Sequence, residues 1–140
     1  MIYYELDDFE FLLPDGSGLG CFAPVFFIPI EWAYKRGFLE ESLVTGEVFI
    51  TNHKKLVDGL IMIDEFVANV IDYKMIDGWF SENIRDFIDV YIRDITSMLV
   101  RYFKCSLSEV PNDWKKYGPI FNILDDEYNA FRKANKIDGV

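Results

Sequence analysis

His53 is the one side chain that could transfer protons near neutral pH, because it is the only histidine of the chain. It follows Asn52 and precedes Lys54 and Lys55. A general base must lie within hydrogen-bond distance of the proton that it removes, and no serine, threonine or cysteine accompanies His53 in a recognised motif. We therefore expect His53 to serve local structure, and the sequence predicts no catalytic residue and no enzyme.

Carboxylates could instead bind a divalent cation, which needs several oxygen ligands in convergent geometry. The densest run is Asp125, Asp126 and Glu127. Consecutive residues of a helix point in different directions, so we interpret this run as a solvated helix face. Cys21 and Cys105 are far apart and accompany a single histidine, which is too few soft ligands for a structural zinc site. The sequence predicts no metal and no cofactor.

Three alternating glycines, Gly16, Gly18 and Gly20, have the spacing of a phosphate-binding loop. Such a loop needs the N-terminus of a helix directly after it. Here a segment rich in strand-forming residues and containing Pro24 follows. We interpret the glycines as part of a hairpin turn.

Aromatic side chains could stack on nucleobases or anchor a protein interface. The candidate side chains are Tyr3, Tyr4, Phe9, Phe11, Trp32 and Trp114. Stacking on nucleobases is typical of basic grooves that follow the phosphates, whereas the charge around most of these rings is negative, so the sequence predicts no nucleic-acid binding. Tyrosine and tryptophan are enriched in protein interfaces. We therefore assign Tyr3 and Trp32 to a partner-binding surface and the phenylalanines to the core.

The strongest functional signal is the charge of the first 34 residues. They contain six of the 24 acidic residues, nine aromatic rings and none of the 14 basic residues, in a chain of net charge −10. A surface of one sign attracts partners of the opposite sign and speeds their association. The acids predicted to bind a partner are Glu5, Asp7, Asp8, Glu10 and Asp15.

These features favour an acidic inhibitor that binds a basic protein. A nuclease presents a cationic cleft to phosphates, and an acidic surface with aromatic anchors can cover that cleft without a catalytic group or a cofactor. The hypothesis is an immunity protein or antitoxin that neutralises a basic bacterial toxin such as a nuclease; a nucleic-acid mimic is a variant of it. The alternatives are a non-catalytic adaptor or structural subunit of a complex and a small metal-dependent enzyme.

The first 50 residues are predicted to be rich in strands and loops. Residues 2–6 alternate in a strand-like pattern, and residues 9–13 and 19–23 flank turn-forming residues at 14–18. Pro24 and Pro29 predict an edge strand or an irregular segment. A short helix is expected over 30–36, ended by Gly37, and a further strand over 47–50.

Residues 51–140 are predicted to be helical. A central helix is expected over about 54–74, because apolar residues occupy more than half of its circumference. A helix over about 81–104 has one apolar stripe, and another begins at Pro119 and runs to about 136. The predicted fold is α+β: a small N-terminal antiparallel hairpin or sheet packed on a bundle of three to four helices.

Length and composition predict a single domain over residues 1–140. A chain of this length with 51% apolar residues can bury a core. The start lacks the basic region of a secretion signal. The longest apolar run, residues 19–30, is shorter than the roughly 20 residues that a membrane span needs. We expect a cytoplasmic monomer or weak dimer that binds no membrane.

Overall fold

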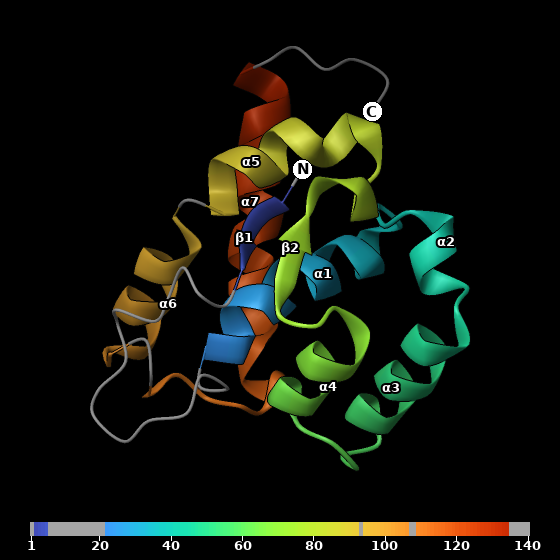
Figure 1. Ribbon diagram of the computed structural model, residues 1–140. Helices are drawn as coiled ribbons and strands as arrows, with labels where there is room; N and C mark the ends of the chain where they lie inside the picture. The colour runs from blue at the N-terminus through green and yellow to red at the C-terminus, as the bar shows by residue number, and fades with distance from the viewer. Residues whose placement is uncertain (1, 6–21, 93, 107–108, 135–140) are drawn as a thin grey trace.

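The protein is built mainly from helices, as Figure 1 shows for the computed structural model. The structure describes residues 2–5, 22–92, 94–106 and 109–134. The helices are α1 Ala23–Arg36, α2 Glu41–Val44, α3 Glu47–Val57, α4 Ile63–Val70, α5 Arg85–Ile92, α6 Ile95–Phe103 and α7 Gly118–Ala134. The prediction of an α+β fold with an N-terminal hairpin sheet is wrong, because one short strand pair is the only regular β-structure among these residues.

That pair joins β1, Ile2–Glu5, to β2, Lys74–Ile76, in antiparallel orientation. Ile2 lies opposite Ile76 and Glu5 opposite Lys74, with a register shift between Ile2 and Tyr4. The strand pattern at the N-terminus is confirmed, but its partner comes from the middle of the chain. Most of the predicted hairpin, residues 9–13 and 19–21, lies outside the described residues.

Helix α1 runs through the centre of the molecule (Figure 1), and residues 23–33 are all buried. The edge strand predicted around Pro24 and Pro29 is therefore wrong. Pro24 lies in the first helical turn, where its missing N–H costs nothing. Pro29 removes one backbone hydrogen bond inside the helix, and burial of apolar side chains on every side offsets this loss. Gly37 ends the helix as predicted, with a positive φ of 75°.

The strand predicted over 47–50 and the central helix predicted over 54–74 are also wrong. Helix α3 begins at Glu47 and ends at Val57. Gly59 follows with a φ of 78°, which ends a helix readily. Helix α4 covers Ile63–Val70 before the chain turns into β2. The apolar residues of 54–74 therefore belong to two short helices and the turns that follow them, and α1 takes the central position.

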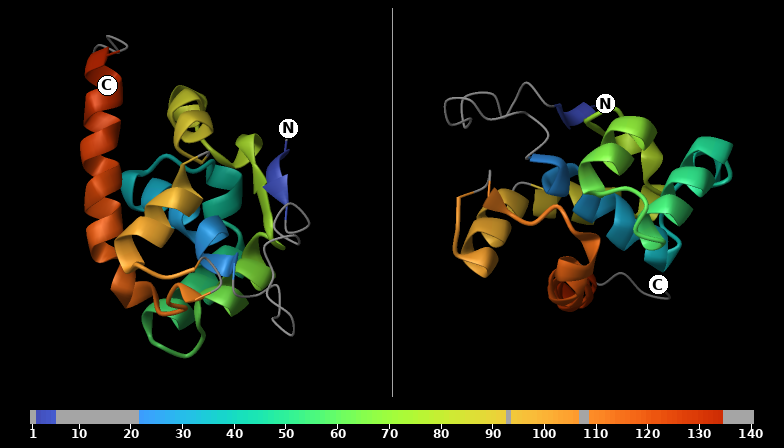
Figure 2. Two further views of the ribbon diagram at one scale, coloured as in Figure 1. Left: turned by 90° about the vertical axis from the view of Figure 1, so that its left-hand side faces the viewer. Right: turned by 90° about the horizontal axis from the view of Figure 1, so that it is seen from below.

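The C-terminal helices follow the predicted patterns more closely. The prediction of a single helix over 81–104 is wrong, because the segment forms a 3₁₀ turn at Glu82–Ile84 and then two helices, α5 and α6. Phe87 and Leu99 of its predicted stripe are buried. Helix α7 begins at Gly118, one residue before Pro119. Figure 2 shows α7 as a long helix along one side of the molecule.

Helix α1 lies between α4 and α7. It contacts α4 on one side and α7 on the other, and α3 packs against α4 at the periphery (Figures 1 and 2). The buried side chains form one hydrophobic cluster. Within the described ranges, none of the helices has the length and apolar character needed to cross a membrane.

Candidate functional site

The structure describes three of the seven predicted partner-binding residues. Tyr3 and Glu5 lie in β1, where Glu5 is opposite Lys74 of β2. Trp32 lies in α1. The remaining predicted acids, Asp7, Asp8, Glu10 and Asp15, lie outside the described residues. The predicted acids therefore begin with Glu5 in β1, which pairs with β2, and all five precede α1 in the sequence.

Trp32 is not a surface anchor, since its exposed fraction is 2%. Its ring contacts Phe87 and Tyr128 at centroid distances of 5.1 and 5.5 Å. Its indole Nε1 donates a hydrogen bond to Oδ1 of Asp125 at 2.9 Å. The assignment of Trp32 to a partner surface is therefore wrong: tryptophan is common in interfaces and in cores, and its position in a helix buried on all sides places it in the core.

Asp125 links α7 to the end of α1. The same Oδ1 that accepts from Trp32 also accepts from Nε and Nη2 of Arg36, at 2.9 and 2.7 Å. The guanidinium of Arg36 lies over the rings of Trp32 and Tyr128, 5.7 and 5.8 Å from their centroids. Three donors from one helix thus hold one carboxylate oxygen, and the arrangement joins two helices.

Glu127 makes the corresponding contact to α5. The hydroxyl of Tyr91 donates a hydrogen bond to Oε2 of Glu127 at 2.6 Å. Burial of the phenol and the nearby carboxylate raise the pKa of Tyr91 to about 12. The two ends of the acidic run Asp125 to Glu127 therefore contact different helices, and Asp126 between them is exposed. Across the described ranges, no three His, Cys, Asp or Glu side chains gather where they could hold a metal ion.

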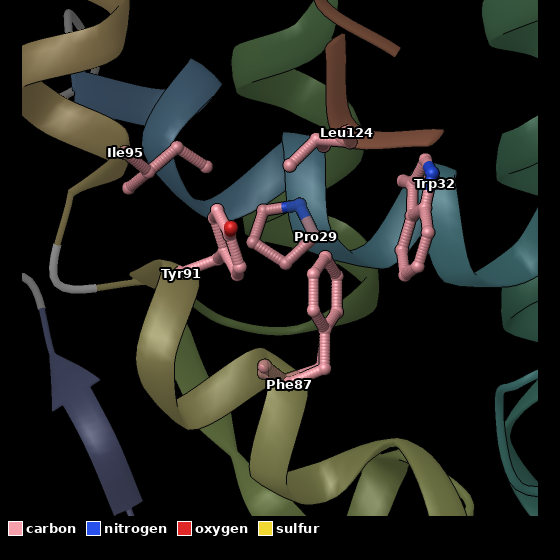
Figure 3. Close-up of a pocket in the computed structure, with 7 residues that line it drawn as sticks. Pro29, Trp32, Phe87, Tyr91, Ile95 and Leu124 are labelled. Carbon is pink, nitrogen blue, oxygen red and sulfur yellow. The ribbon is translucent and has the colours of Figure 1, made fainter. Parts of the chain in front are cut away.

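A small cavity lies where α1, α5, α6 and α7 meet (Figure 3). It is lined by Pro29, Trp32, Phe87, Ile88, Tyr91, Ile95 and Leu124. Its volume of about 10 Å³ is close to the minimum for one water molecule. The polar atoms of its lining side chains, the Tyr91 hydroxyl and the Trp32 indole N–H, are both bonded to carboxylates of α7. We therefore assign the cavity to imperfect packing between four helices and not to a substrate site.

The pair of side chains best suited to proton transfer is Glu31 of α1 with His53 of α3. Glu31 is 3% exposed and is the only buried charged residue among those described. Nε2 of His53 lies 3.0 Å from Oε1 and 2.9 Å from Oε2 of Glu31. This nitrogen therefore carries its hydrogen and donates it to the carboxylate.

Aromatic rings enclose the imidazole of His53, which is 17% exposed. The ring of Phe49 is stacked on it with an interplanar angle of 6°, and the rings of Tyr34 and Phe66 lie 4.6 and 6.0 Å away. A carboxylate can orient a histidine for general-base catalysis. No serine, threonine or cysteine of the described residues is hydrogen-bonded to this imidazole. The pair forms a polar contact between α1 and α3.

Sequence reasoning missed the role of Glu31, although a signal was present. Glu31 is the only charged residue between Asp15 and Lys35, in a segment that is otherwise almost entirely apolar. A charged residue in such a segment is buried only if it finds a partner. His53 is that partner, and its residue number gives no hint of the contact because the two residues lie in different helices.

Comparison with known proteins adds no functional information: no family model matches the chain, and neither the curated proteins nor the solved structures contain a match.

Proposed function

We propose that this chain is an acidic binding protein that neutralises a basic partner, as an immunity protein or antitoxin neutralises a bacterial toxin such as a nuclease. The observation that carries the proposal is the charge distribution. The net charge is −10, and none of the 14 basic residues precedes Lys35. Such a patch speeds association with a cationic protein, and the partner's charge offsets the repulsion among the acids.

The contacts of the described side chains favour binding over catalysis. His53 donates to a buried carboxylate, and Asp125 and Glu127 accept from side chains of neighbouring helices. Each of these groups has a structural contact that accounts for its position. An inhibitor requires none of them to be reactive.

The adaptor alternative rested on a surplus of aromatic residues. Among the aromatic residues described between 22 and 134, Tyr34 and Tyr102 are the exposed ones, at 38% and 41%. The other rings described in this range pack within or against the core. Core packing accounts for the surplus in this part of the chain, so the localised charge is the feature that distinguishes the hypotheses.

Two charge variants of the full chain test the proposal. The first replaces the acids Glu5, Asp7, Asp8, Glu10 and Asp15 by Gln or Asn. The matched control makes the same change at five exposed acids elsewhere, namely Glu41, Asp58, Glu65, Glu82 and Asp86. Both variants carry the same net charge, so any difference between them reports the position of the charge.

The tagged chain is expected to capture a basic protein from a native lysate, and this protein should be toxic alone and harmless when both are co-expressed. Association of the purified pair should slow by at least about tenfold for the first variant and much less for the control. The wild-type rate should also fall steeply with salt, because exposed charges are screened beyond about 10 Å at 0.1 M. A partner whose binding ignores both salt and the first variant would contradict the proposal.

A further inference from the structure

The outer face of α3 and the loop after it expose a concentration of apolar side chains. Five of the nine exposed large apolar residues described in the structure lie between positions 48 and 62. They are Val48, Ile50, Val57, Leu60 and Met62, with exposed fractions of 57, 55, 46, 71 and 43%. Figure 1 shows α3 at the periphery with α4 beside it. Apolar residues gathered in this way are typical of a contact surface.

One stripe of α3 combines two of these apolar residues, Ile50 and Val57, with charges of both signs. Ile50, Lys54 and Val57 are spaced by four and three residues, so they lie on one side of the helix. Glu47 precedes Ile50 by three residues and extends the stripe towards the start of α3. All four residues are exposed.

Two of the described neighbours of α3, namely α1 and α4, make their side-chain hydrogen bonds elsewhere on it. Nδ2 of Asn69 in α4 donates a hydrogen bond to Oδ1 of Asn52 at 3.0 Å. His53 faces Glu31 of α1. Asn52 is two residues from Ile50 and from Lys54, so it lies on the opposite flank of the helix. The stripe therefore remains uncovered by the helices that the structure describes.

We propose that this stripe is the contact surface of a homodimer, in which α3 of one copy lies antiparallel to α3 of a second copy. In an isologous interface the same patch of both subunits meets across a two-fold axis. An axis near Ile50 places the two Ile50 side chains against each other. Glu47 of each copy then lies opposite Lys54 of the other, because these residues stand three before and four after Ile50.

The charge order of the stripe fits a second copy better than the basic partner proposed above. Lys54 lies in the middle of the stripe, where it repels a cationic surface and attracts Glu47 of a second copy. The contact is small, because one pair of short helices buries less than the roughly 1,600 Å² of a standard interface. Each copy also carries a net charge of −10. The dimer is therefore weak, and it is independent of the inhibitor function.

Sedimentation equilibrium of the full chain between about 10 μM and 1 mM measures this weak association. Glu47→Lys and Lys54→Glu should each raise the dimer dissociation constant by at least about fivefold, because each places two pairs of like charges across the axis. The double variant should restore the dimer. An equimolar mixture of the two single variants should form a heterodimer, since opposite charges meet again.

Cross-linking tests the position of the axis. In a chain with Cys21 and Cys105 replaced by Ser, Ile50→Cys should oxidise to a disulfide-linked dimer, because a residue at the axis meets its own copy within disulfide distance. Val48→Cys is the matched control. Its side chain is equally exposed, at 57% against 55% for Ile50, but it lies on the other flank of α3.

Three results would overturn the proposal. The first is a chain that stays monomeric at 1 mM protein, a concentration at which a millimolar dissociation constant is detectable. The second is cross-linking through Val48→Cys that equals cross-linking through Ile50→Cys. The third is an Ile50→Lys variant that loses capture of a basic protein while the wild-type chain is monomeric, which would assign the stripe to that other partner.

Discussion

Carboxylates join α1 to its neighbours on two sides, in very different surroundings. Towards α3, Glu31 is 3% exposed and meets a single nitrogen of His53. Towards α7, Asp125 is 40% exposed and accepts hydrogen bonds from three donors of Trp32 and Arg36. The carboxylate that accepts more hydrogen bonds, Asp125, is therefore also the one more exposed to solvent.

We expect burial to outweigh the number of hydrogen bonds in setting the stability that each contact contributes. A buried carboxylate that loses its partner has no water to replace it, and the cost of its desolvation remains. A half-exposed carboxylate can be hydrated instead, so its contacts contribute less. We therefore expect the contact between Glu31 and His53 to contribute more stability than the contacts of Asp125.

His53→Ala is the substitution with the largest expected effect. It leaves the buried carboxyl group of Glu31 without its partner, which costs about 3–5 kcal/mol of unfolding free energy. Urea denaturation of the variant measures this loss, with the exposed neighbour Lys54→Ala as the control. Partner binding should persist wherever the variant is folded, because the described contacts of His53 are made to residues of α1, α3 and α4, none of which is among the acids predicted to bind a partner.

A second substitution separates the charge from the packing. Glu31→Gln added to His53→Ala removes the buried charge, so the double variant should be more stable than His53→Ala alone. Equal stability of His53→Ala and Lys54→Ala would contradict the expectation that the contact between Glu31 and His53 contributes more stability than the contacts of Asp125.

The sequence predicted the helices whose signals are local. Helix α7 was predicted from Pro119 and an apolar stripe, and it begins one residue earlier. Helix α1 was missed for two reasons. Proline is typical of edge strands, so Pro24 and Pro29 favoured a strand, and a helix that is apolar on all sides shows no alternation of apolar and polar residues. Gly59 was overlooked as a break, so two short helices were predicted as one.

The candidate sites were harder to predict, because their contacts join residues far apart in the chain. Glu31 and His53 lie in different helices, and no spacing rule connects them. Trp32 was assigned to the surface by residue type alone, whereas its burial depends on the position of α1 among the other helices. The predicted acids Asp7, Asp8, Glu10 and Asp15 lie outside the described residues, so their role stays a prediction.

Asp125→Ala should have a smaller effect, on the more exposed side of α1. It leaves the indole N–H of Trp32 and the guanidinium of Arg36 without their acceptor, and the guanidinium can be hydrated. We expect a loss of about 1–2 kcal/mol, most of it from the buried indole. Thermal or urea unfolding measures it, and the exposed neighbour Asp126→Ala should change stability by less than about 0.5 kcal/mol. A loss larger than that of His53→Ala would contradict the role of burial.

The effect expected at the second contact of α7, between Tyr91 and Glu127, appears only at alkaline pH. The pKa of Tyr91 is raised from its ordinary value of 10.0 to about 12 by burial and by the Glu127 carboxylate. The unfolded chain therefore loses this proton at a lower pH than the folded chain. The associated stability is fully present below pH 10 and is lost as the pH rises towards 12.

Urea midpoints measured across this interval should fall less steeply for Tyr91→Phe than for the wild type. Burial also raises the pKa of Tyr117, so some alkaline loss should remain in the variant. An unchanged slope would show that the Tyr91 hydroxyl ionises alike in the folded and unfolded chains.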